Sequence, residues 1–166
     1  LYLDAYPLVP YSMYGGVPLA TIKRTLLELK AEGKLDRVRM LLLTNCTFDG
    51  HVYHTRRVME ECLAIKPDLI FLWDEAWFAY ARFSPFLRPR TSMGAAEFLR
   101  RRYRAPAYAE EYAKFKAEVG EISLANDKAM EMHLLPDPDA VRIRAYATQS
   151  THKSLSALRQ GSMIHV

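Results

Sequence analysis

The spacing of apolar residues changes between two patterns along the first half of the chain. Residues 38–43 and 69–73 are near-continuous apolar runs, which are typical of strands covered on both faces. Residues 17–32 and 55–66 instead repeat apolar side chains every three or four positions, which predicts helices with one buried face. A strand, a helix and a second strand in this order predict a βαβ unit with parallel strands.

The second half of the chain is less regular. Residues 82–106 are rich in Arg, Pro and Ser and predict a loop with a short helix over 94–103. A longer helix is predicted over 107–119, because its aromatic side chains share one face. Apolar and polar residues then alternate over 141–147, the pattern of a strand with one wet face. The last residues, 163–166, are the start of another apolar run and predict a further strand.

Composition narrows the class of protein. The 166 residues are half apolar, which is enough for one core of ordinary size and predicts a single α/β domain. No apolar stretch approaches the roughly 18 residues of a membrane span, so we expect no membrane partner and a cytoplasmic location. Two cysteines are too few for a disulfide framework. The chain opens on Leu1 and stops within an apolar run, and we expect it to be a piece of a longer protein.

The net charge of +4 is concentrated in one Arg-rich stretch between residues 82 and 104, whose only acid is Glu97. Such a stripe can contact nucleic acid or an acidic partner surface. However, it has no aromatic stacking pattern and no zinc-finger spacing. We therefore interpret it as a solvated and partly mobile insertion, and we expect no nucleic-acid partner.

Polar groups follow three of the predicted strands, at 44–47, 74–77 and 148–153. In a mostly parallel sheet these strand ends meet at one edge. The second group contributes Asp74 and the third contributes Lys153. A partly desolvated lysine amine can attack an aldehyde, and a carboxylate can keep a pyridine nitrogen protonated. An acid and a lysine at one sheet edge are therefore what pyridoxal phosphate chemistry requires, whereas a lysine beside a histidine, taken alone, is usually a surface pair.

Two other groups of residues allow different interpretations. The acidic string at 74–77 is similar to the acidic box of helicases, but the chain has no Gly-x-x-x-x-Gly-Lys-Ser/Thr string to hold phosphates. His51 and His54, with Cys46 nearby, could be drawn as a metal site. A fourth spaced ligand is missing, so a turn that lines a pocket or interface is the better account, and we expect no bound metal.

Four groups of residues in a fixed order carry a family resemblance over roughly residues 8–90 and 141–166. They are Tyr14-Gly15-Gly16-Val17-Pro18, Thr44-Asn45-Cys46-Thr47-Phe48-Asp49-Gly50, Asp74-Glu75-Ala76-Trp77, and Thr148-Gln149-Ser150-Thr151-His152-Lys153 with Ser162-Met163-Ile164-His165-Val166. Together they resemble the bacterial ornithine, lysine and arginine decarboxylases. The resemblance implies a three-layer sandwich around a mostly parallel sheet, as in the major domain of fold type I, and pyridoxal 5'-phosphate as the cofactor.

The resemblance also implies the roles of individual residues. Lys153 corresponds to the lysine that bonds the cofactor, and Asp74 corresponds to the acid that faces its pyridine nitrogen. Trp77 corresponds to an aromatic residue at the edge of the cofactor pocket. Ser150 and His152 correspond to positions that contact the cofactor phosphate or lie beside it, and we count His152 with Lys153 and Asp74 as catalytic.

Other positions match the family less closely. Thr44 and Asn45 match the loop under the hydroxyl side of the cofactor, although a structural Asx-type turn explains Asn45 equally well. The interval from Asp74 to Lys153 is longer than in most of the family, which implies an Arg-rich and helical insertion over 82–140. The upstream phosphate loop and the carboxyl-terminal small domain are missing, so residues 1–166 are expected to form a partial cofactor-binding major domain.

The activity that the resemblance implies is decarboxylation of lysine, arginine or ornithine to the amine and carbon dioxide, the chemistry of polyamine biosynthesis. A homodimer or larger homo-oligomer is expected to carry it out. The sequence does not discriminate among the three amino acids. One alternative is another reaction on the same cofactor fold, such as transamination, since a fold does not fix its chemistry. A second alternative is a non-catalytic binding or regulatory module with the Arg-rich stretch as its contact surface.

Overall fold

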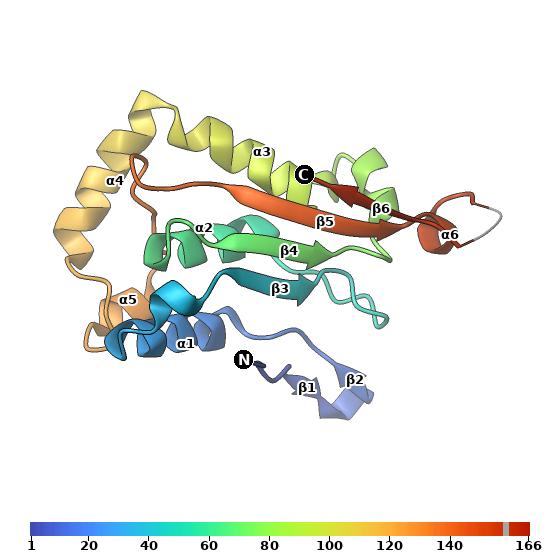
Figure 1. Ribbon diagram of the computed structural model, residues 1–166, viewed down its shortest axis with the longest axis horizontal. Helices are drawn as coiled ribbons and strands as arrows, with labels where there is room; N and C mark the ends of the chain where they lie inside the picture. The colour runs from blue at the N-terminus through green and yellow to red at the C-terminus, as the bar shows by residue number, and fades with distance from the viewer. Residues whose placement is uncertain (158–159) are drawn as a thin grey trace.

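The computed structural model of the chain describes residues 1–157 and 160–166. Its centre is a four-stranded sheet in the order β3-β4-β5-β6 (Figure 1). The strands are Met40–Thr44 (β3), Ile70–Asp74 (β4), Arg144–Ser150 (β5) and Ser162–His165 (β6). β3, β4 and β5 are parallel, whereas β6 is antiparallel to β5. The α/β class is confirmed, and the sheet is mixed.

The direction of β6 follows from the length of the connection before it. A parallel crossover needs about a dozen residues or more, usually with a helix. The connection 151–161 is shorter, and the chain therefore turns back alongside β5, where Ser150 pairs with Ser162. As a result, the start of β6 lies at the same edge of the sheet as the ends of the parallel strands.

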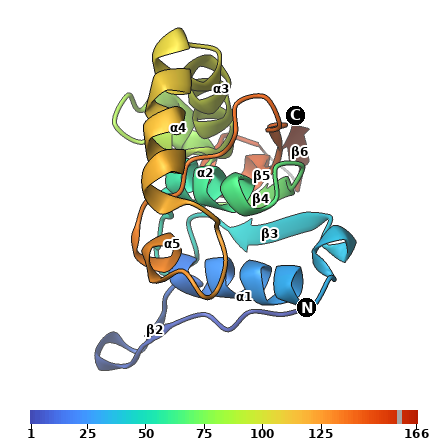
Figure 2. The same cartoon turned by 90° about the vertical axis from the view of Figure 1, so that its left-hand side faces the viewer.

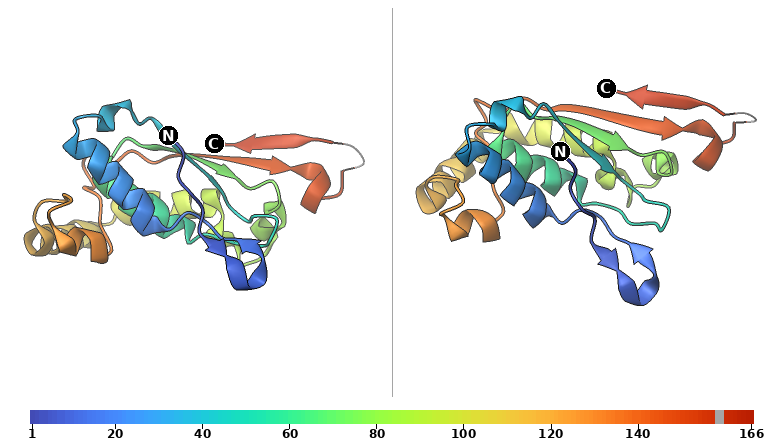
Figure 3. Two further views of the ribbon diagram at one scale, coloured as in Figure 1. Left: turned by 90° about the horizontal axis from the view of Figure 1, so that it is seen from below. Right: turned by 60° about the horizontal axis from the view of Figure 1, so that its bottom comes forward.

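Three helices form a layer on one face of the sheet (Figure 3). They are Leu19–Ala31 (α1), Thr55–Ile65 (α2) and Ser92–Tyr103 (α3). The helical spacing of apolar residues predicted α1 and α2, and α3 lies where we predicted a short helix over 94–103. The chain leaves the end of α1 through Gly33, which adopts a left-handed conformation with φ of 67°. α3 begins after Thr91, whose side chain accepts a hydrogen bond from the backbone N–H of Gly94 at 3.1 Å.

The other face of the sheet is open in the part of the chain that the structure describes. Leu43, Phe71 and Trp73 point toward the helices and are buried, whereas Met40 and Leu42 on the opposite face are 46% and 59% exposed. Successive side chains of a strand alternate between faces, so every second residue of β3 lies on this open side. The prediction that residues 38–43 are covered on both faces is therefore wrong for the described chain.

The remaining elements surround this core. They are the strands Pro7–Leu8 (β1) and Met13–Tyr14 (β2) and the helices Pro106–Val119 (α4), Asp127–Glu131 (α5) and Thr151–Ser154 (α6). β1 and β2 form a small hairpin that projects from the body (Figure 2). α4 and α5 lie at the end of the sheet opposite to α6 (Figure 1). None of the helices that the structure describes is both long enough and apolar enough to cross a bilayer.

The Arg-rich stretch takes part in the core through α3. Ala95, Ala96 and Leu99 are buried, and α3 contacts both α2 and β5. The arginines at 100 and 101 lie on its exposed side. The interpretation of the stretch as solvated is therefore wrong for α3, because Ala95, Ala96 and Leu99 pack in the core.

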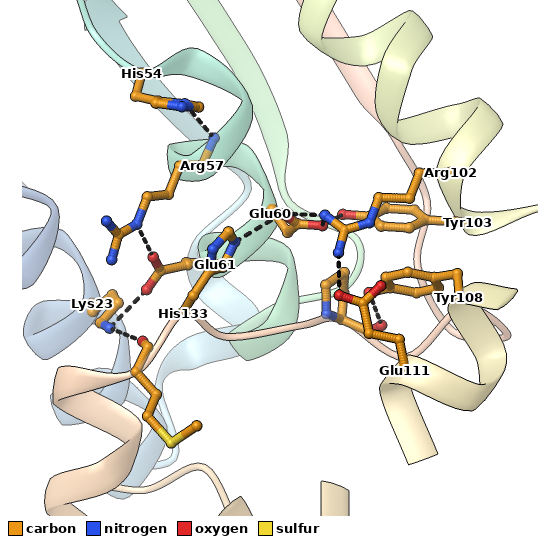
Figure 4. A network of polar contacts seen from close by, with 12 residues as sticks. Lys23, His54, Arg57, Glu60, Glu61, Arg102, Tyr103, Tyr108, Glu111 and His133 are labelled. Carbon is orange, nitrogen blue, oxygen red and sulfur yellow. Dashed lines mark hydrogen bonds and ion pairs between the residues drawn. The ribbon is translucent and has the colours of Figure 1, made fainter. Parts of the chain in front are cut away.

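Buried carboxylates tie the helix layer together (Figure 4). Glu60 of α2 is 1% exposed and accepts hydrogen bonds from Nη1 of Arg102 at 2.9 and 3.1 Å, and Nε2 of His133 lies 2.8 Å from its second oxygen. The adjacent Glu61 is fully buried and pairs with Lys23 of α1 at 2.7 Å. Because a buried charge is costly without partners, these contacts fix α2 against both neighbouring helices.

Candidate active site

The three parallel strands end in register. Thr44 pairs with Asp74, and Asp74 pairs with Thr148. The ladder continues one step further, since the N–H of Asn45 donates to the carbonyl of Asp74 and the N–H of Glu75 donates to the carbonyl of Thr148, both at 2.8 Å. The prediction that the three polar groups meet at one edge of the sheet is confirmed. Thr44, Asp74 and Thr148 alternate with buried residues and therefore lie in a row on the open face.

Asp74 is held in place through one of its two carboxylate oxygens. Oδ1 accepts hydrogen bonds from the backbone N–H of Ala76 at 3.1 Å and from the hydroxyl of Thr148 at 3.4 Å. Within the described residues, Oδ2 has no donor. The side chain is half-buried. The arrangement fixes the carboxylate and leaves one acceptor oxygen for a ligand.

Lys153 reaches the same edge from the neighbouring strand. It lies in α6, directly after β5, and its Nζ is 5.2 Å from the ring centre of Trp77. Trp77 follows Asp74 by three positions and is 40% exposed, with its ring edge-to-face against Phe48. Stacking of an ammonium on an indole is a favourable contact. The lysine itself is exposed, so the described residues do not provide the partial desolvation that we expected for its amine.

Ser150 and His152 lie at the start of α6, and only His152 has a side-chain contact with the local backbone among the described residues. Ser150 is buried at the start of α6 and makes no capping hydrogen bond with its side chain. Nδ1 of the exposed His152 lies 3.3 Å from the N–H and 3.2 Å from the carbonyl of Gly161, just before β6. Both residues are at the predicted edge, and their contact with a cofactor phosphate stays a prediction.

Glu75 is a buried acid to which the sequence analysis gave no role. Its Oε1 accepts hydrogen bonds from Nδ2 of Asn45 at 3.0 Å and from the N–H of Ser92 at 2.6 Å, and its Oε2 accepts one from Nε2 of Gln149 at 3.3 Å. Burial raises the pKa of Glu75, while the hydrogen bonds from Ser92, Asn45 and Gln149 act in the opposite direction. The alternation of faces along β4 could have placed Glu75 on the helix side, next to Asp74.

Asn45 is also structural. It is fully buried, donates to the carbonyl of Arg90 at 3.0 Å and accepts from the N–H of Tyr53 at 3.1 Å. These contacts close the loop between β3 and α2 and give Asn45 a structural role. The Asx-type turn that we predicted is wrong, because Oδ1 accepts from Tyr53, eight positions on, and not from the backbone two positions on. Thr44, its neighbour, is exposed on the open face.

The two histidines of the loop before α2 have separate structural contacts. Nδ1 of His54 accepts a hydrogen bond from the backbone N–H of Arg57 at 3.3 Å and caps the helix. The ring of His51 lies edge-to-face against Tyr53, with ring centres 5.8 Å apart. Cys46 is buried with Phe78 and Ala81 in a small apolar cluster. The loop therefore packs against the body of the domain through these side chains.

Comparison with known families identifies the domain. A family model described as Orn/Lys/Arg decarboxylase, major domain, matches residues 1–101. The chain belongs to this family. The match includes Thr44, Asp74 and Trp77 and continues through most of α3. The family likeness thus extends past residue 90, where we expected it to break.

Curated relatives in the family are decarboxylases of basic amino acids. The chain is 27% identical over 158 residues to the lysine decarboxylase LdcA of Pseudomonas aeruginosa, covering 92% of this chain and 15% of that protein. It is 32% identical over 125 residues to the biodegradative arginine decarboxylase of Escherichia coli, covering 75% of this chain and 11% of that protein. A lysine decarboxylase of Hafnia alvei is 27% identical over 158 residues, covering 94% of this chain and 15% of that protein.

The chain thus spans about 15% of the length of the curated lysine decarboxylases that it matches. No solved structure matches it.

Proposed function

We propose that this chain forms part of the cofactor-binding domain of a pyridoxal-phosphate-dependent decarboxylase of basic amino acids. The observation that carries the proposal is that Asp74 and Lys153 lie at the same edge of the sheet, after two adjacent parallel strands. Asp74 lies at the end of β4, and Lys153 comes from the end of β5 to lie over Trp77. The named relatives act on lysine or arginine, which supports a basic amino acid as the substrate.

The residues at this edge fit the cofactor. Oδ2 of Asp74 lacks a donor within the described chain and can accept a hydrogen bond from a protonated pyridine nitrogen. Lys153 would bond the cofactor, Trp77 and Thr44 would border its ring, and Ser150 and His152 would lie toward its phosphate. When bound, pyridoxal phosphate supplies an electron-withdrawing ring that stabilises the negative charge left after carbon dioxide departs.

The chain's own side chains would handle protons and orientation. The negative charge of Asp74 would keep a proton on the ring nitrogen, and the bonds from Ala76 and Thr148 would hold the carboxylate in position. Nζ of Lys153, or an acid outside this chain, would return a proton to the substrate carbon after carbon dioxide leaves. Partial desolvation favours the uncharged amine that attacks an aldehyde, so further covering of the exposed Lys153 in the working enzyme is part of the proposal.

The open face of the sheet supports a third layer. Met40 and Leu42 present apolar side chains there, and a cover of helices would bury them. We therefore propose that the complete protein completes the three-layer sandwich of fold type I, and that it works as a homodimer or larger homo-oligomer in the cytoplasm.

Replacement of Lys153 tests the proposed function. In the complete protein that contains this chain, Lys153→Ala should abolish both the visible absorbance of bound pyridoxal phosphate and the release of carbon dioxide. Lys128→Ala, which removes an exposed lysine in α5 at the other end of the sheet, is the control and should leave both unchanged. Retained absorbance in Lys153→Ala would remove this lysine from its role.

The products separate the proposal from its alternatives. Carbon dioxide release from lysine, arginine or ornithine supports decarboxylation, whereas formation of a keto acid without carbon dioxide would indicate transamination. A wild-type protein without cofactor absorbance would instead indicate a non-catalytic module.

A further inference from the structure

Each of three residues on the open face is followed in the chain by a buried polar residue on the helix side. The pairs are Thr44 with Asn45, Asp74 with Glu75, and Thr148 with Gln149. Because side chains alternate between the two faces of a sheet, the second member of each pair lies directly behind the candidate site.

Glu75 joins the residues behind the site. Its carboxylate receives donors from the loop after β3, from β5 and from the first residue of α3, through Asn45, Gln149 and Ser92. The connection continues to β6, since Oε1 of Gln149 lies 3.0 Å from Nε2 of His165. The amide of Gln149 already donates to Glu75, so its oxygen must accept, and His165 must carry its proton on Nε2. All four strands of the sheet are therefore linked through one carboxylate.

We propose that Glu75 is a positioning residue for the cofactor site. It fixes the spacing between the ends of β3, β4 and β5, and thereby the placement of Asp74 relative to Lys153. This role rests on the proposed function, because it assigns to Glu75 the support of the acid and the amine that would hold the cofactor.

The chemistry of the three contacts explains why this position carries a carboxylate. All three partners are donors, and an ionised carboxylate is an acceptor on both oxygens. A glutamine at position 75 would place an NH2 group either against the two donors on one side or against the amide N–H of Gln149. In the second case the Gln149 amide would have to turn, which sets its NH2 against the Nε2–H of His165 unless His165 moves its proton as well. An unsatisfied buried donor is costly, and the rearrangement of Gln149 and His165 changes the contacts that set the spacing of the strand ends.

The test exchanges the carboxylate of residue 75 with the amide of residue 149. In the complete protein, Glu75→Gln should raise the dissociation constant for pyridoxal phosphate by about tenfold or more, because small displacements of a site are costly. The double variant Glu75→Gln with Gln149→Glu restores every donor and acceptor, since the new carboxylate accepts from residue 75 and from His165. It should return the dissociation constant to within about threefold of wild type.

A control separates positioning from general destabilisation. Glu61→Gln alters another fully buried acid, the partner of Lys23 in the helix layer, and should lower Tm without changing the affinity for pyridoxal phosphate. In cofactor-free protein, amide hydrogen exchange at Asn45 and Glu75 should accelerate in Glu75→Gln and stay unchanged in Glu61→Gln, since these two amides bond across the strand ends.

The outcomes distinguish this role from the proposed function. A wild-type protein that binds no pyridoxal phosphate overturns the proposed function and the positioning role with it. A wild-type protein that binds it, with an unchanged affinity in Glu75→Gln or no recovery in the double variant, overturns the positioning role alone. If Glu75→Gln does not fold, Gln149→Met removes only one of the three contacts and should weaken cofactor binding in the same direction.

Discussion

Asp74 and Glu75 are neighbours in the chain with opposite surroundings. Within the described residues, donors occupy only one oxygen of Asp74, on the open face. Donors occupy both oxygens of Glu75, which is fully buried on the helix side. An acid with a free acceptor is suited to bind a ligand, and one with every acceptor used is suited to hold structure. Substitutions at the two positions should therefore differ in their effects.

Asp74→Asn should slow carbon dioxide release by about 100-fold or more, the order that a single preorganised electrostatic contact contributes in enzymes. The oxygen of asparagine can still accept from Ala76 and Thr148, so the fold should remain, whereas the charge that holds a proton on the ring nitrogen is lost. The rate, the cofactor affinity and Tm of the complete protein would be measured together. Asp36→Asn, at an exposed acid, is the control. A near-normal rate would mean that another acid faces the nitrogen.

At the residue scale, the sequence predicts the position of a side chain that directly follows a strand. Asp74 and Lys153 each follow a predicted strand, so their arrival at one sheet edge could be expected, although their catalytic roles stay proposals. The contacts of Glu75 could not be expected in the same way. Its donors lie 17, 30 and 74 positions away, and only the assembled sheet and helix layer bring them together.

At the scale of elements, the long helices with a repeated apolar face were predicted from the sequence, and the short helices were not. α1, α2 and α4 have enough turns to show a repeated apolar face, whereas α5 and α6 have five and four residues and cannot. β5 begins at Arg144, later than the predicted 141, because Val141 and Ile143 continue the apolar alternation while lying outside the strand. The spacing of apolar residues thus predicted the main helices and strands but not all of their end residues.

The cap of α2 should be sensitive to acid. Burial, and then the positive charges of Arg90, Arg56 and Arg57, lower the pKa of His54 from 6.5, and its capping bond to the N–H of Arg57 requires an unprotonated Nδ1. The folded chain therefore binds fewer protons than the unfolded chain. The stability that His54 contributes is complete above pH 6.5 and is lost as the pH falls from 6.5 through the lowered pKa.

His54→Asn should remove this dependence, since asparagine caps helices at any pH with a contribution of about 1 kcal/mol. Thermal unfolding of the variant and of wild type would be compared between about pH 8 and about pH 5. The Tm values should be similar at the upper limit, and the variant should be the more stable at the lower limit. A difference that does not change with pH would contradict the assignment.

At the scale of the whole molecule, the described chain has distinct ends and faces. The candidate site lies at one end of the sheet, and α4 and α5 lie at the other (Figure 1). The return of β6 and the open face could not be predicted from periodicity, because strand order and coverage depend on contacts between distant segments. The apolar run of β3 indicated two covered faces, and only one is covered within the described residues.

Arg102 connects the helix layer to α4, because its guanidinium binds buried Glu60 and also Glu111 at 2.7 Å. Arg102→Ala should lower the free energy of unfolding by about 3 kcal/mol, the lower end of the cost of breaking a buried pair, since His133 still contacts Glu60. Arg101→Ala removes only an exposed pair with Glu97 at 3.8 Å and should cost less than about 0.5 kcal/mol. Denaturant unfolding would measure both, and equal losses would contradict a structural role for Arg102.

Glu60 and Glu61 point from α2 toward different partners, with Arg102 and His133 on one side and Lys23 on the other (Figure 4). Insertion or deletion of one residue in the helix ahead of them would rotate both carboxylates by about 100°. Glu60 would then lose Arg102 and His133, and Glu61 would lose Lys23. Homologous sequences can therefore differ widely on the outer surface of the helices, but the number of residues between His54 and Glu60 should be invariant.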